Sequence, residues 1–191
     1  MIMKRLAIFV SGGGTNLQRI AEYFAPNEEV ELACVVSNNK EAYANQRAKN
    51  LGIPLLLVDK PYFTSDQFVE RMKNLDIDLI VLAGFLWLIP QGLIDAFPNK
   101  IINIHPALLP KYGGKGFYGH HVHEAVVAAH EKESGITIHY VNEHYDSGNI
   151  IFQKKVSLSP TDTPDDVAAK IHILEQENFP VVIEKLLFDK K

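Results

Sequence analysis

The chain has 191 residues, of which 47% are hydrophobic and 22% are charged. This length is enough for one domain with a well-packed core and too short for two full-sized domains. Its net charge of -4 excludes the basic footprint of a protein that binds nucleic acid or an anionic membrane, although a local anion pocket stays possible. Cys34 is the only cysteine, so no internal disulfide forms, and no stretch reaches the roughly 18 apolar residues of a membrane span. We expect a single domain over residues 1–191, soluble and cytoplasmic, with no nucleic-acid or membrane partner.

The first predicted element is the apolar run Leu6–Val10, which is typical of a central parallel strand and ends at the glycines of Ser11–Gly14. Thr15 or Asn16 is expected to cap the helix that follows. Backbone N–H groups at such a helix start can bind phosphate. The dinucleotide fingerprint is incomplete, because Leu17 stands where its third glycine belongs and the next strand ends without an acid for a ribose. The loop therefore predicts a monophosphate site; a tight turn that binds nothing is the alternative.

Helical and strand-like segments then alternate along the chain. The predicted helices span 42–50, 65–74 and 91–97, and the predicted strands 30–36, 54–58, 78–82 and 101–105. This alternation predicts right-handed crossovers and an α/β fold with a mostly parallel central sheet covered on both faces. Ligands of such sheets bind beyond the carboxyl ends of the strands, so function is expected at 12–16, 83–89 and 103–110.

The strand predicted at 101–105 carries two polar side chains in an otherwise apolar run. Asn103 and His105 are two residues apart, so both point to the same face, and Pro106 ends the strand. An unpaired buried polar group costs about 1–3 kcal/mol, so each of them needs a partner. Such residues can be satisfied inside a core, but the pair, followed by a proline-rich loop, predicts a functional site.

The loop Ala83–Pro90 follows a buried strand yet stays apolar. It either packs under the next helix or walls a pocket for a flat aromatic ligand. Further along, His120 and His123 stand three apart, whereas the zinc-binding helix of metalloproteases needs a spacing of four with an intervening glutamate. This histidine cluster therefore predicts the solvated start of a helix rather than a metal site.

Two more strands are predicted at 135–141 and 150–156, and together they suggest a hairpin at the sheet edge. In the loop between them, Asp146 and Gly148 would by default form a turn. A helix then begins near Thr163 and carries Glu175 on an otherwise core-facing surface.

Four segments together carry a resemblance to a known family: Gly12–Asn16, Leu82–Phe85, Asn103–Pro110 and Asp146–Gly148. They resemble the motifs of the phosphoribosylglycinamide formyltransferases, folate-dependent enzymes of purine biosynthesis. The resemblance covers nearly the whole chain, and Asn-Ile-His-Pro-x-Leu-Leu-Pro with a downstream Asp-x-Gly is specific to the wider formyltransferase family. Within the wider family, the length of 191 residues favours the phosphoribosylglycinamide formyltransferases, because methionyl-tRNA formyltransferases and formyltetrahydrofolate hydrolases carry a further domain.

The resemblance implies a three-layer, Rossmann-like formyltransferase fold. It also implies transfer of a formyl group from 10-formyltetrahydrofolate, as co-substrate, to the amine of glycinamide ribonucleotide, without a metal. By the same resemblance the catalytic trio is Asn103, His105 and Asp146. The nucleotide is expected at Gly14, Thr15, Asn16, His172 and Glu175. The folate is expected at Phe85, Leu86, Trp87, Leu88, Ile89, Asn103, Asn142, Glu143, His144, Tyr145 and Asp146. These small molecules are the expected partners, and the protein is expected to be a monomer or homodimer.

The chemistry of formyl transfer fits these residue types. The reaction passes through a tetrahedral intermediate, and a donor to its oxygen is worth about 2.7–4 kcal/mol. Asn103 and protonated His105 can each donate a hydrogen bond to that oxygen. Asp146 is expected to raise the pKa of His105. Three alternatives stay open: a formyltetrahydrofolate hydrolase, an amino-sugar-nucleotide formyltransferase, and a non-catalytic or dehydrogenase-like nucleotide-binding domain.

Overall fold

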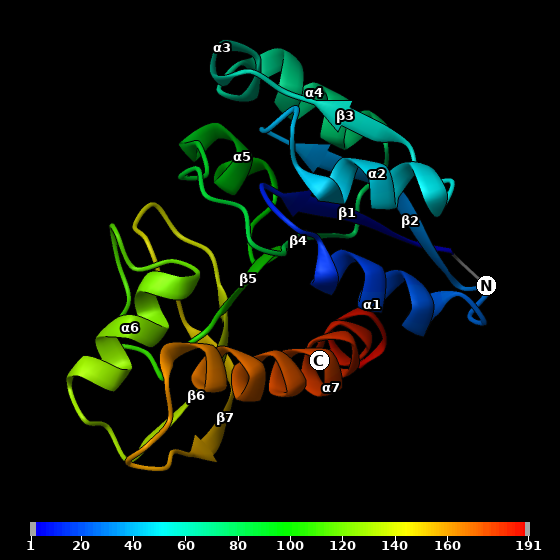
Figure 1. Ribbon diagram of the computed structural model, residues 1–191. Helices are drawn as coiled ribbons and strands as arrows, with labels where there is room; N and C mark the ends of the chain where they lie inside the picture. Colours follow the sequence, from blue (N-terminus) through cyan, green and yellow to red (C-terminus); the bar gives the residue numbers. More distant parts are fainter. Residues whose placement is uncertain (1–2, 190–191) are drawn as a thin grey trace.

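A seven-stranded sheet organises the computed structural model, which describes residues 3–189 (Figure 1). Its strands are β1 (Lys4–Val10), β2 (Val30–Ser37), β3 (Leu55–Leu57), β4 (Leu79–Leu82), β5 (Ile101–His105), β6 (Glu133–Tyr140) and β7 (Ile150–Ser157). Their order is β3-β2-β1-β4-β5-β6-β7; β1 to β5 pair in parallel, whereas β6 and β7 pair antiparallel. The predicted mostly parallel sheet is confirmed, and the predicted hairpin forms its antiparallel edge.

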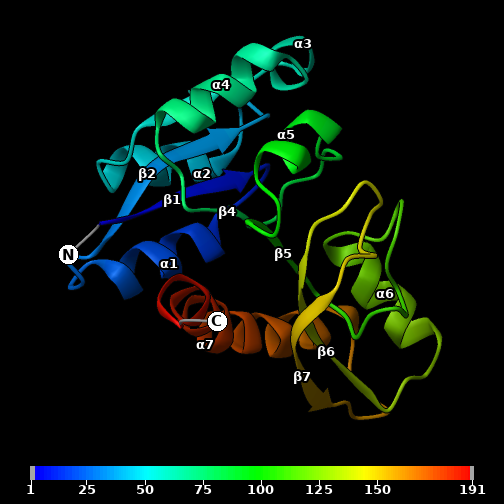
Figure 2. The same cartoon turned by 180° about the vertical axis from the view of Figure 1, so that it is seen from behind.

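Helices cover both faces of the sheet, which gives three layers (Figures 1 and 2). They are α1 (Thr15–Phe24), α2 (Tyr43–Asn50), α3 (Lys60–Phe63), α4 (Asp66–Asn74), α5 (Gln91–Ala96), α6 (His120–Ala128) and α7 (Pro164–Phe188). Alternate residues of β1 point to opposite faces of the sheet, so the core has two halves. Leu6 and Ile8 pack with α1, α2, α6 and α7 on one face. Ala7 and Phe9 pack with α3, α4 and α5 on the other. No helix among residues 3–189 is long and apolar enough to cross a membrane.

The chain changes direction at β1, and this positions the site. From β1 it moves to β2 and β3 on one side, then returns to β4 and β5 on the other. Crossovers diverge at such a switch point and leave a crevice at the carboxyl ends of the two central strands. The loops after β1 and β4 meet there: Ser11 N donates to Gly84 O at 3.1 Å, and Leu86 N donates to Ser11 Oγ at 2.9 Å.

Helix α7 begins where the sequence predicts and continues to Phe188. The side chains of Thr163 and Asp166 form a capping box at its start. Pro180 lies inside the helix and has no N–H to offer the carbonyl of Gln176, four residues earlier. Arg19 Nε of α1 donates to that carbonyl at 3.1 Å, so a neighbouring helix supplies the missing hydrogen bond.

Candidate active site

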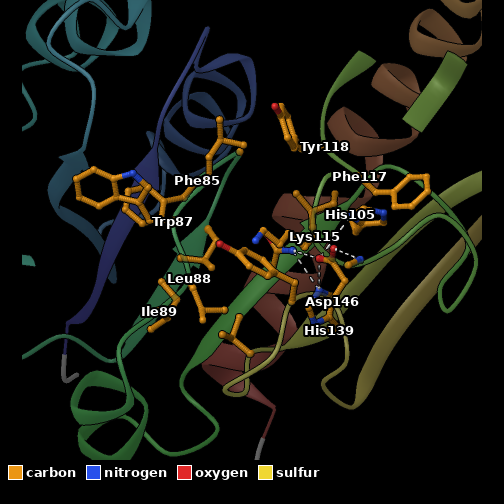
Figure 3. Close-up of a pocket in the computed structure, with 18 of the residues that line it drawn as sticks. Phe85, Trp87, Leu88, Ile89, His105, Lys115, Phe117, Tyr118, His139 and Asp146 are labelled. Atoms are coloured by element: carbon orange, nitrogen blue, oxygen red, sulfur yellow. Dashed lines mark hydrogen bonds and ion pairs between the residues drawn. The ribbon is translucent and has the colours of Figure 1, made fainter. Parts of the chain in front are cut away.

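A cavity of about 240 Å³ opens at the carboxyl ends of β4 and β5. Three parts of the chain form its wall (Figure 3): the loop after β4, the loop Gly114–Gly119, and the segment from His139 to Asp146. Asn103 and His105 project into it from β5. They share a face of the sheet, as predicted, while Ile102 and Ile104 pack in the core on the other face.

The three residues of the expected trio meet at this cavity although Asp146 lies far from the other two in sequence. Asn103 Nδ2 donates to Asp146 Oδ1 at 3.3 Å, and His105 Nδ1 lies 3.5 Å from the same oxygen. Antiparallel pairing of β5 with β6 brings the β6–β7 loop, and Asp146 with it, over the end of β5. The sheet topology therefore assembles the trio.

His105 is 3% exposed, and both nitrogens of its ring face acceptors. Nε2 lies 2.7 Å from the carbonyl oxygen of Tyr112; because a carbonyl only accepts, Nε2 carries a hydrogen and Nδ1 is the atom that titrates. Burial lowers the pKa of His105, while Asp146 and the Tyr112 carbonyl raise it, and burial prevails. Asp146 thus raises the pKa of His105, as expected, but burial lowers it by more, and the site favours a neutral imidazole.

Asp146 is held ionised by several contacts. Burial by itself would raise the pKa of its carboxyl group, but its contacts with His139, with His105 and with the N–H of Gly114, 2.9 Å from Oδ2, bring it below its ordinary value. Its backbone has a φ of 52°, in the left-handed region that aspartate tolerates better than most residues. Gly148, two residues on, must lack a side chain because a Cβ there would collide with the Tyr140 carbonyl.

His139 is a member of this cluster that the sequence analysis missed. It is 2% exposed and lies opposite Asn103 in the β5–β6 pairing, with 3.1 Å between His139 Nε2 and Asn103 Nδ2. His139 Nε2 also lies 3.6 Å from Asp146 Oδ1. The sequence contained a signal for it, because strand alternation puts Ile136, Ile138 and Tyr140 on one face and His139 on the other.

Two polar side chains, those of buried Thr137 and exposed Gln153, fix the loop that follows His105. Thr137 Oγ1 donates to Ala107 O at 2.7 Å and accepts from Leu109 N at 3.0 Å. Gln153 Nε2 donates to Leu109 O at 3.0 Å and to Thr137 Oγ1 at 2.9 Å. A hydrogen-bond network whose groups are all satisfied rigidifies its surroundings. It therefore holds the segment that leads to the Tyr112 carbonyl, the partner of His105.

The apolar loop after β4 supplies the wall opposite the trio (Figure 3). Phe85 and Ile89 are buried, whereas Leu86 is 49% and Leu88 is 37% exposed. The rings of Phe85 and Trp87 lie 6.1 Å apart between centroids, in an edge-to-face arrangement. Aromatic walls of this kind suit a flat ligand. The residues expected to bind folate line this cavity, with the exception of Glu143.

The residues expected to bind the nucleotide gather at a separate place, between α1 and α7. Asn16 Nδ2 donates to Glu175 Oε2 at 3.1 Å, and His172 Nδ1 lies 3.9 Å from the same oxygen. Burial raises the pKa of Glu175 to about 7, although its hydrogen bond with Asn16 lowers it. This group does not line the cavity. β1 and β5 are separated only by β4, so their ends lie roughly 10 Å apart along the sheet edge.

The expected side-chain cap of α1 is wrong. Gly14 occupies the N-cap position with a φ of 73° and a ψ of 27°, and no side chain caps the helix. Thr15 and Asn16 belong to the first turn instead, where backbone N–H groups have no partner within the helix. A Cβ on Gly14 would lie 2.7 Å from Ala44 Cβ, so the adjoining helix allows only glycine here.

The histidine cluster on α6 is only partly as expected. His120 and His121 are exposed, but His123 is 6% exposed and its Nδ1 has no hydrogen-bond partner. The prediction of a solvated helix start is therefore wrong for His123, because its position on α6 turns inward. Within residues 3–189, no three His, Cys, Asp or Glu residues group as a metal site requires.

Known proteins match almost all of this chain. The chloroplastic phosphoribosylglycinamide formyltransferase of Vigna unguiculata is 42% identical over 189 residues, which are 96% of this chain and 61% of the relative. The phosphoribosylglycinamide formyltransferase of Haemophilus influenzae is 37% identical over 188 residues, or 95% of this chain and 86% of the relative. The chain thus spans 61% and 60% of the length of the two plant relatives that it matches.

Solved structures and a family profile agree with these relatives. The phosphoribosylglycinamide formyltransferase from Anaplasma phagocytophilum superposes with a TM-score of 0.88 at 33% identity, over 98% of this chain and 89% of that chain. The one from Bacillus halodurans gives 0.88 at 34%, over 98% and 97%. The profile described as formyl transferase matches residues 4–183. The chain therefore belongs to the formyl transferase family.

Proposed function

We propose that this protein transfers the formyl group of 10-formyltetrahydrofolate to the amine of glycinamide ribonucleotide, in purine biosynthesis. The observation that carries the proposal is the meeting of Asn103, His105 and Asp146 in one cavity, at 3.3 and 3.5 Å, opposite an apolar wall. The relatives are named phosphoribosylglycinamide formyltransferases, which supports this acceptor. The sequence predicts a cytoplasmic reaction; the relatives from plants are named chloroplastic.

We assign the proton transfers to His105. The amine attacks the formyl carbon, the carbonyl oxygen gains negative charge, and the amine must then lose a proton while the folate nitrogen gains one. A neutral His105, with Nε2 bound to the Tyr112 carbonyl, accepts that proton at Nδ1. The imidazolium so formed lies 3.5 Å, from Nδ1 to Oδ1, from ionised Asp146, which stabilises it until the proton passes to the leaving nitrogen.

The two binding regions match the two substrates. The pterin packs against Phe85–Ile89, and the phosphate binds the free N–H groups at the start of α1, where the helix dipole also favours an anion. Glu175 then lies near the ribose. Because the ends of β1 and β5 lie roughly 10 Å apart, a nucleotide whose phosphate binds at the start of α1 can extend its amine toward the formyl carbon.

Incubation of the purified protein with both substrates tests the proposal. Tetrahydrofolate should appear only when glycinamide ribonucleotide is present, in a 1:1 ratio with formylated nucleotide. Equal release of tetrahydrofolate without the nucleotide would instead identify a hydrolase. A panel of acceptor amines that includes an amino-sugar nucleotide separates the remaining transferase alternative.

A further inference from the structure

Lys115 is a cation in the cavity wall to which the mechanism gives no role. Among residues 3–189 it is the only lysine or arginine that lines this cavity. It lies between Gly114 and Gly116, whose φ values are 93° and 95°. Figure 3 shows it on the side of His105 and Asp146, across the cavity from Phe85 and Trp87.

The ammonium group of Lys115 forms no ion pair within residues 3–189. Asp146, the one carboxylate of the described cavity wall, is already bound by Asn103, His105 and the Gly114 N–H. Lys111, between β5 and α6 like Lys115, forms an ion pair instead: its Nζ lies 2.8 Å from Glu131 Oε1. Lys111 also does not line the cavity. Lys115 is thus a cation available to an anionic part of a ligand.

We infer that Lys115 binds a carboxylate of the glutamate tail of the folate, an inference that rests on the proposed function. The pterin needs the buried apolar wall of Phe85 and Ile89, whereas the charged tail must stay close to solvent, where Lys115 is exposed. The phosphate of the nucleotide is the other substrate anion. Its expected site at the start of α1 lies outside this cavity.

The residues that follow Lys115 fit the middle of the same ligand. Phe117 and Tyr118 line the cavity with rings that are 37% and 48% exposed. A folate carries an aromatic ring between its pterin and its glutamate. Exposed aromatic side chains close to a lysine in the cavity wall therefore match an aromatic ring next to a carboxylate in the ligand.

Calorimetry with two probes tests the inference. Tetrahydrofolate carries the glutamate, and tetrahydropteroate lacks it. We expect Lys115→Met to bind tetrahydrofolate about tenfold more weakly than the wild type at low salt, and tetrahydropteroate equally well. Lys115→Arg should restore most of the loss. Lys111→Met, which removes a charge from the same loop outside the cavity, should bind both probes as the wild type does.

The other outcomes each overturn a definite statement. Wild-type protein that binds neither probe contradicts the proposed function and this inference together. Wild-type protein and Lys115→Met that bind tetrahydrofolate equally contradict this inference alone. Equal weakening of both probes places Lys115 against the pterin, and weakening of glycinamide ribonucleotide alone places it at the phosphate; either result overturns the assignment to the tail.

Discussion

Asn103 and His139 face each other across β5 and β6, with 3.1 Å between Asn103 Nδ2 and His139 Nε2. His139 Nδ1 lies 2.9 Å from the carbonyl oxygen of Tyr140, so Nδ1 carries the hydrogen and Nε2 is an acceptor. Asn103 Nδ2 has a second acceptor in Asp146 Oδ1, at 3.3 Å. Both acceptors contact the Nδ2 nitrogen, and together they fix the orientation of the amide group.

Replacing Asn103 or His105 with alanine should lower turnover by roughly 10²–10³, because Asn103 stabilises the tetrahedral intermediate and His105 transfers the protons. The KM of both substrates should change little, because these groups act in the transition state. Steady-state kinetics measures both effects. His121→Ala is the matched control, since its side chain is 61% exposed. Full turnover by either cavity variant would falsify the mechanism.

Replacing His139 with leucine should lower turnover less, by about tenfold, because Asp146 still holds the Asn103 amide when one of its two acceptors is lost. His139→Gln, which keeps an acceptor, should recover part of the loss. Because His139 is buried, thermal denaturation of each variant must accompany the kinetics. A variant with normal stability and normal turnover would show that Asp146 alone is sufficient to orient Asn103.

Asp146→Asn should move the activity profile to more acidic pH. In the wild type Asp146 raises the pKa of His105 against the larger effect of burial, so removing the carboxylate leaves burial with less opposition. The base is then neutral, and hence active, down to a lower pH. A pH profile of kcat/KM and an NMR titration of the His105 ring measure the shift. A higher pKa in the variant would contradict this account.

Gly14→Val should weaken nucleotide binding and leave folate binding nearly intact. A Cβ on Gly14 would lie 2.7 Å from Ala44 Cβ, and a φ of 73° is strained for valine, so the start of α1 must move. Calorimetry with each substrate separates the two sites. Gly13→Ala is the control, because a Cβ there meets nothing within 4 Å. Equal loss of both ligands would indicate a folding defect instead.

Glu175→Gln should make the protein less sensitive to pH. The folded protein holds the pKa of Glu175 at about 7 against an ordinary 4.5, so it binds more protons than the unfolded chain between these values. Wild-type stability therefore falls as pH rises through this window, by up to about 3 kcal/mol at pH 8. The advantage of Glu175→Gln in free energy of unfolding should grow from pH 5 to pH 8.

Urea titrations at several pH values measure this difference. Glu177→Gln is the matched control, because Glu177 is exposed on the same helix. An equal pH dependence in the wild type and Glu175→Gln would show that the carboxyl group of Glu175 ionises normally.

The sequence by itself determined the elements and much of the cavity. Apolar runs, glycine loops and helical periodicity are local signals, and they predicted the alternating strands and helices and the mostly parallel sheet. Spacing of two put Asn103 and His105 on one face, and the resemblance added Asp146. These features could be predicted because strand alternation and helix capping depend on residues a few positions apart.

Only the tertiary structure decided how these residues act on one another. The β5–β6 register, a contact between distant segments, placed His139 against Asn103. The pKa of His105 depends on how much protein surrounds it, and burial reversed the direction expected from Asp146 alone. The packing of α2 put Gly14 rather than Thr15 at the N-cap of α1. Desolvation and close packing arise from contacts between segments far apart in the chain, so no local pattern contains them.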